Sequence, residues 1–285
     1  MEDRGKAIKE VITYVLLTFA LSIIFYIPMV STRSMNIYGG YGVLGLMWCP
    51  GLAAIAVNLL YRRTLRGMGW RPGDVRYLIW SYGIPILYGT VLYTAVWFSG
   101  LGGFKTGFPM QDLPQIILVG TVFGIISAAG EEIGWRGLLV PRLFNLTSSF
   151  TKTCLITGLI WASWHYPGLI FADYNAGTPA VFGLLMFTLI VVEITFVMSW
   201  LRLRSGSLWT GVLFHTSHNL FIQDVFNPLT IDTGYTRYIT GEFGIGLVIL
   251  GLVMAFIAYS KRSELTAPGK DQTIPASLEI SPQVR

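Results

Sequence analysis

Eight apolar stretches, each long enough to cross a bilayer, decide the fold class of this chain. A helix of about 20 apolar residues spans the roughly 30 Å hydrocarbon core of a membrane. Apolar residues make up 53% of the chain and charged residues only 12%, a balance far from that of soluble domains. The sequence therefore predicts an all-α, polytopic membrane protein with about eight transmembrane helices. The predicted spans are residues 11–30, 43–61, 78–98, 115–135, 154–171, 181–203, 208–226 and 243–259.

The basic residues indicate the orientation of these spans. With the N-terminus in the cytoplasm, 17 of the 20 Lys and Arg residues fall in cytoplasmic segments, and three fall outside. This asymmetry follows the positive-inside rule and explains the net charge of +5 without a nucleic-acid partner. We predict an integral membrane protein, in the cell membrane if the source is prokaryotic, with both termini cytoplasmic and the lipid bilayer as its surroundings. Residues 1–262 form the predicted membrane domain, and 263–285 a disordered cytoplasmic tail.

Two adjacent carboxylates, Glu131 and Glu132, end the fourth apolar stretch. A charge near the centre of a membrane costs about 2.5–3.5 kcal/mol on insertion scales, so buried carboxylates need compensation. Glu132 and Arg136 are four residues apart, share a helix face and are predicted to pair. Glu131 has no such partner, so we expect polar groups from other helices to contact it.

Two further predicted spans carry polar side chains at a matching depth. His165 lies in the fifth span, two residues before Pro167, and His215 and Asn219 share a face of the seventh. Counted from the basic residues at the predicted cytoplasmic boundary, Glu131, His165 and His215 each lie roughly 16–20 Å along their helices. Side chains at one level can meet, and ionisable groups within a membrane mark a functional site by default.

These residue types support two kinds of chemistry. A carboxylate in a low-dielectric site can act as a general base toward water held by a histidine, while a second histidine and an asparagine donate hydrogen bonds to an oxyanion. Alternatively, Glu131, His165 and His215 can bind a divalent metal such as zinc, with an open fourth position for water. The sequence has no H-E-x-x-H motif and does not decide between the two.

Two other polar residues lie in the predicted spans. Glu193, within the sixth span, can line the cavity or form an interhelical hydrogen bond. His218 lies directly before Asn219, and we assign it no catalytic role.

These polar residues fall into three motifs that resemble the CPBP family of intramembrane proteases, also called the Abi family. The family includes the type II CAAX prenyl endopeptidases and bacteriocin-processing or immunity proteins. The resemblance covers about residues 115–221 and departs at Trp161, where the family usually has Phe, a change expected to affect packing. The motifs are Glu131-Glu132-x-x-x-Arg136, an aromatic residue (Trp161) four positions before His165, and His215-x-x-x-Asn219.

The resemblance implies an eight-helix fold with a polar catalytic cavity open to the cytoplasmic side. Family members are usually described as metalloproteases, and a glutamate-activated water without metal is also argued for them. The implied roles are Glu131 as the base that activates water, His165 holding that water, His215 with Asn219 as the oxyanion site, and Glu132 with Arg136 supporting Glu131.

We therefore predict a CAAX-type intramembrane endopeptidase acting on a peptide or prenylated protein, through CAAX processing or processing of leader or bacteriocin-type peptides. The alternatives are a catalytically silent immunity or scaffold protein, and a transporter coupled to protons or metal ions. An intact set of buried polar residues favours the enzyme, because a silent scaffold gains nothing from buried charge.

Overall fold

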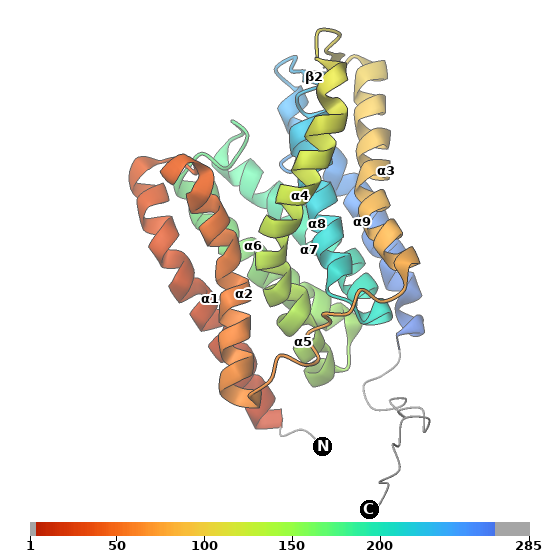
Figure 1. Cartoon of the computed structure of the whole chain (residues 1–285). Helices are drawn as coiled ribbons and strands as arrows, with labels where there is room; N and C mark the ends of the chain where they lie inside the picture. Colours follow the sequence, from red (N-terminus) through yellow and green to blue (C-terminus); the bar gives the residue numbers. More distant parts are fainter. Residues whose placement is uncertain (1–3, 266–285) are drawn as a thin grey trace, which may run out of the picture.

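The computed structural model describes residues 4–265, which form a bundle of helices (Figure 1). Strand is confined to the antiparallel pair β1 (Gly103–Phe104) and β2 (Thr230–Ile231) within this part of the chain. Short 3-10 turns lie at η1 (Tyr38–Gly40), η2 (Met110–Asp112), η5 (Thr236–Tyr238) and η6 (Lys261–Glu264). The main helical segments are α1 (Arg4–Thr32), α2 (Tyr41–Arg62), α3 (Val75–Ser99), α4 (Leu113–Glu132), η3 (Ile133–Leu139), α5 (Val140–Thr147), α6 (Phe150–Phe171), α7 (Ala180–Ser205), α8 (Trp209–Asn219), η4 (Leu220–Phe226) and α9 (Ile245–Ser260).

The predicted all-α membrane fold is confirmed. Seven helices of the described part are long and apolar enough to cross a membrane. The remaining predicted span, 208–226, is also helical, but α8 and η4 do not meet that criterion. This segment carries the polar residues His215, His218 and Asn219, which lower its hydropathy. The predicted tail, 263–285, lies outside the described residues except for 263–265.

Both ends of the described chain lie at one end of the bundle. The start of α1 and the end of α9 both lie at the lower end of the bundle in Figure 1, on opposite sides of it. At this end Glu10 of α1 is buried and forms ion pairs with Arg62 at 2.9 Å and with Arg142 at 3.1 Å. Arg62, at the end of α2, therefore connects that helix to α1.

Glycines let α2 and α4 cross at the level of the carboxylate pair. A Cβ atom on Gly51 would lie 2.5 Å from the carbonyl oxygen of Gly130, and one on Gly134 would lie 2.7 Å from Cβ of Pro50. Small residues allow helix backbones to approach closely inside a membrane. Gly130 and Gly134 flank the carboxylates, so this contact fixes where the backbone of Glu131 lies.

Two π-helical segments directly follow the polar motifs. η3 continues α4 after Glu132, and η4 continues α8 after Asn219. A π-helical turn shifts the register of the side chains that follow it, and such turns occur frequently at functional sites. Both site helices therefore change their winding beside the polar residues.

Candidate active site

A cavity of about 220 Å³ lies among α1, α2, α4, α6, α7 and α8. The four residues predicted to be catalytic all line it, although they come from three helices distant in the sequence. These residues are Glu131, His165, His215 and Asn219.

Glu131 is held by two indole groups. Its Oε2 atom accepts hydrogen bonds from Nε1 of Trp161 at 2.7 Å and from Nε1 of Trp135 at 3.2 Å. Only 2% of Glu131 is exposed. The expected polar partner from another helix is therefore Trp161 of α6, together with a residue one turn along its own helix. Since Oε2 is occupied by both indoles, Oε1 is the oxygen left to act on a ligand in the cavity.

Glu132 connects the first motif to the third. Its Oε1 atom accepts a hydrogen bond from Nη1 of Arg136 at 3.0 Å, as the spacing predicted, and lies 3.1 Å from Nδ1 of His215. A carboxylate can only accept, so Nδ1 of His215 carries the hydrogen and donates it. This bond leaves Nε2 of His215 for the cavity. Gly211 of α8 makes room for Glu132, because a Cβ atom there would lie 2.6 Å from Oε2 of Glu132.

Arg136 is fully buried and has partners on three sides. Besides Glu132, its guanidinium contacts Sδ of Met198 at 3.0 Å and lies over the ring of Trp161, 4.3 Å from the ring centroid. A cation over an indole face is attracted by the ring quadrupole. Trp161 therefore contacts both Glu131 and Arg136, the arginine that pairs with Glu132. The aromatic character of Trp161 alone did not predict these two contacts.

His165 has a defined tautomer. Its Nδ1 atom lies 2.9 Å from the carbonyl oxygen of Trp161, which can only accept, so Nδ1 donates. Nε2 is then free to accept a hydrogen bond from a molecule in the cavity. The rings of Trp164, Phe187 and Tyr174 surround the imidazole, with centroids 4.7, 4.8 and 6.1 Å away.

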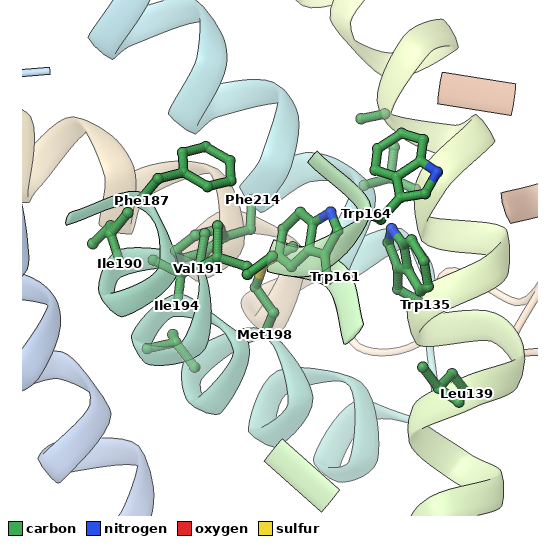
Figure 2. Close-up of a cluster of buried hydrophobic side chains, with 14 of the residues drawn as sticks. Trp135, Leu139, Trp161, Trp164, Phe187, Ile190, Val191, Ile194, Met198 and Phe214 are labelled. Carbon is green, nitrogen blue, oxygen red and sulfur yellow. The ribbon is translucent and has the colours of Figure 1, made fainter. Parts of the chain in front are cut away.

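Apolar side chains of α7 form one wall of this cavity. Figure 2 shows Phe187, Ile190, Val191, Ile194 and Met198 along that helix, with Trp161 close to Met198. Such a wall provides contact area for apolar groups of a ligand and lowers the local dielectric, which strengthens the polar interactions beside it.

A second polar network was missed by sequence reasoning. Glu242, in the segment before α9, is buried and accepts hydrogen bonds from Tyr174 and Gln223, both at 2.8 Å. His218 contacts both Glu242 and Tyr88. Its Nε2 atom lies 3.3 Å from Oε1 of Glu242, and its Nδ1 atom forms a hydrogen bond with the hydroxyl of Tyr88. The signal available in the sequence was a lone carboxylate directly before the last apolar run. His218 is thus part of the cavity wall, through contacts that its position within the third motif did not reveal.

Glu242 remains ionised in this network. Burial alone would raise the pKa of its carboxyl group, but the hydrogen bond and charge of His218, with the hydrogen bonds of Tyr174 and Gln223, lower the pKa to about 2. Hydrogen bonds to the charged form of a carboxylate favour that form. Glu242 therefore presents a negative charge whose oxygens are already engaged by protein donors.

Glu193 lies away from the cavity. It does not belong to the cavity lining, and its Oε2 atom would lie 2.3 Å from a Cβ atom placed on Gly251 of α9. Of the two roles considered for Glu193, the structure favours contact between α7 and α9 over a role in the cavity.

The side chains do not converge as a metal centre. A catalytic zinc site needs three protein ligands about 2 Å from one point. Within residues 4–265, no three His, Cys, Asp or Glu side chains are grouped in this way. Oε2 of Glu131 and Nδ1 of both histidines are also engaged by protein groups. Metal binding by Glu131, His165 and His215 stays a prediction, and no step below depends on it.

Comparison with known proteins agrees with the residues in the cavity. Residues 113–221 match the family model described as type II CAAX prenyl endopeptidase Rce1-like. This range contains all three motifs and nearly coincides with the predicted 115–221. No match was found among curated proteins. Residues 113–221 therefore match an Rce1-like domain, which is the domain of a family of CAAX-type intramembrane proteases.

Proposed function

We propose that this protein is an intramembrane endopeptidase that hydrolyses a peptide bond with water activated by Glu131. One observation carries the proposal. A carboxylate held by two indole groups shares a partly apolar cavity with the free Nε2 atoms of two histidines and with Asn219. This set supplies a base, a group that orients water and two donors for an oxyanion, without a Ser or Cys nucleophile.

The reaction begins when Oε1 of Glu131 removes a proton from water. Nε2 of His165 accepts the second hydrogen bond of that water and orients it. The water oxygen attacks the carbonyl carbon of the substrate, and the resulting oxyanion receives hydrogen bonds from Nε2 of His215 and the amide of Asn219. When the carbon–nitrogen bond breaks, Glu131 returns its proton to the leaving amine, giving one carboxylate and one amine product.

The oxyanion role requires a protonated His215. Its Nδ1–H group donates to Glu132, so a second donor at Nε2 exists only in the imidazolium form. Glu132 stabilises that charge at 3.1 Å. Cleavage should therefore decline at high pH as His215 loses a proton, and a variant lacking only the Asn219 amide should retain this decline.

The cavity suits a substrate with apolar residues beside the cleaved bond. Wall residues such as Phe187 and Ile190 give such side chains a buried contact surface. Two substrate classes agree with the family: the C-terminal segment of a prenylated CAAX protein and a leader or bacteriocin-type peptide. In both, a short extended segment must enter the cavity.

The test is cleavage by the purified full chain in liposomes. The substrates are a prenylated CAAX peptide, the same peptide without its prenyl group, and a leader-type peptide with apolar residues at the cleavage site. We expect cleavage of at least one substrate by the wild type, and a rate lower by about 10²–10⁴-fold for Glu131→Gln. A wild-type rate for Glu131→Gln would overturn the proposed mechanism. Cleavage of none of the three by a folded wild type would instead favour the silent scaffold or the transporter.

A further inference from the structure

The two ends of the catalytic cavity differ. Toward the chain termini, the residues that follow Glu131 and Glu132 are densely packed: Trp135, Arg136 and Leu139 have no exposed surface. Toward the opposite end, the cavity continues past His165 and Asn219. A substrate therefore has a space to occupy on only one side of Glu131.

Arg202 of α7 closes the end of the cavity nearest the termini. Its Nε atom donates to the carbonyl oxygen of Arg136 at 2.8 Å, and its Nη2 atom donates to that of Gly67 at 3.4 Å. Arg202 is 5% exposed. One side chain thus ties together η3, α7 and the segment between α2 and α3.

That segment, residues 63–74, covers the same end. Figure 1 shows it crossing the lower part of the bundle from α2 to α3. Its Met68 is 2% exposed, and the amide of Leu208 donates to the carbonyl oxygen of Gly69 at 2.9 Å. A Cβ atom on Gly69 would lie 2.8 Å from the carbonyl oxygen of Gly206. The contact is close enough that substrate could pass here only if this segment moved away.

The opposite end of the cavity is formed by connections between helices. Met35 belongs to the connection between α1 and α2, Tyr174 to that between α6 and α7, and Glu242 to the segment before α9. Figure 1 shows the first two connections at the end of the bundle away from the start of α1. A second, more polar cavity of about 360 Å³ continues from Tyr174, Gln223 and Glu242 toward Asp173 and Arg237.

We infer that the substrate reaches Glu131 from the end of the bundle away from the chain termini, between Met35, Tyr174 and Glu242. This inference rests on the proposed protease function and names the route to the same site. It departs from the cytoplasmic opening that the resemblance implied.

The charge distribution identifies this side of the membrane. The segments predicted to be cytoplasmic, which include both terminal segments of the sequence, carry 17 of the 20 Lys and Arg residues, whereas the connections at the other end carry Arg33, Lys105 and Arg237. By the positive-inside rule, the end with the cavity mouth faces away from the cytoplasm. The substrate class is therefore an extended, apolar segment of an exported or membrane-anchored peptide, presented at the extracytoplasmic face.

Two cysteine variants of the full chain test the route in intact cells. Met35→Cys places a thiol at the proposed mouth, and Arg66→Cys places one on the exposed surface of the segment at the opposite end. Both native cysteines, Cys49 and Cys154, are buried, and the unsubstituted protein measures their labelling. The probe is a membrane-impermeant maleimide, applied before and after permeabilisation.

We expect Met35→Cys to be labelled in intact cells and Arg66→Cys only after permeabilisation. Labelling of both variants only after permeabilisation, or of Arg66→Cys alone in intact cells, would overturn the inference. The same labelling in a Glu131→Gln background makes this result independent of activity.

A second measurement tests whether substrate must use this route to be cleaved. Modification of purified Met35→Cys with a bulky maleimide should abolish cleavage, whereas the same modification of Arg66→Cys should leave its rate unchanged. Full cleavage by completely modified Met35→Cys would exclude entry at this end. If the unmodified proteins cleave no substrate, the proposed function fails, while the labelling still decides which end of the cavity is accessible.

Discussion

Glu131 depends on indole nitrogens for its orientation. Trp161 and Trp135 both donate to the same carboxylate oxygen, so the other oxygen is the one left for a ligand in the cavity. Phe at position 161 would keep the aromatic packing but remove the shorter of the two bonds. The sequence could reveal an unusual aromatic residue here, but its hydrogen bond depends on how α6 crosses α4, which no local pattern encodes.

Trp161→Phe should therefore lower kcat more than it raises KM. A hydrogen bond to a charged group contributes about 1.5–3 kcal/mol, which corresponds to roughly a 10- to 100-fold loss of rate. The measurement is steady-state cleavage by the purified variant, with Trp164→Phe as a control because its indole donates to Ser22 rather than to Glu131. Equal effects of the two substitutions would indicate a general packing defect.

Arg136→Ala should destabilise the protein as well as inactivate it. Glu132 would lose its partner at 3.0 Å inside a fully buried site, and removal of one partner of a buried pair costs about 3–5 kcal/mol. The measurement is thermal unfolding in detergent beside Glu131→Gln, which keeps the size of the side chain. Wild-type stability of Arg136→Ala would show that the pair does not compensate the buried carboxylate.

At the scale of elements, close helix crossings determine where the polar side chains meet. The apolar stretches predicted the helices to within a few residues at most ends, and the spacing of Glu132 and Arg136 predicted their pair. The π-helical turns of η3 and η4 were not predicted, because they arise from packing between helices rather than from composition. Glu242 was missed for a related reason: its partners Tyr174, Gln223 and His218 come from separate parts of the chain.

Gly51→Ala should disrupt the crossing of α2 and α4. The added methyl group would lie 2.5 Å from the carbonyl oxygen of Gly130, so the two helices must separate beside Glu131. We expect lower thermal stability and a loss of cleavage. Gly83→Ala in α3 is the matched control, because a Cβ atom there has no atom within 4 Å, and it should keep both properties. Equal behaviour of the two variants would contradict the role given to this crossing.

Glu242→Gln should change how stability depends on acid. The pKa of Glu242 is about 2 in the folded protein, below its ordinary value of 4.5, so this carboxylate stabilises the fold fully above about pH 4.5. That contribution is lost as the pH falls from 4.5 toward 2. Thermal unfolding across this range should therefore show a shallower acid dependence for Glu242→Gln than for the wild type. Identical slopes would mean that the network of His218, Tyr174 and Gln223 does not hold an ionised Glu242.

At the scale of the whole molecule, the residues proposed to activate water lie inside a helical bundle that is packed closed at the end nearest the termini. Composition and charge predicted the membrane fold, and the three motifs predicted the residues that gather in the cavity. The direction of the cavity could not be predicted, because it depends on Arg202 and on the segment 63–74 that covers the end nearest the termini. This closed end is also the end rich in basic residues. The proposed route therefore differs from the cytoplasmic opening that the resemblance implied.

The most direct test of Glu131 as the base is cleavage by protein whose metal content has been measured. The full chain is purified, treated with a chelator and analysed for bound metal, and its cleavage rate is compared with that of Glu131→Gln. We predict that the wild type cleaves with far less than one metal ion per chain, and that Glu131→Gln loses about 10²–10⁴-fold in rate without unfolding. Near-stoichiometric zinc, with cleavage abolished by chelation and restored by zinc, would contradict this mechanism and make Glu131, His165 and His215 metal ligands.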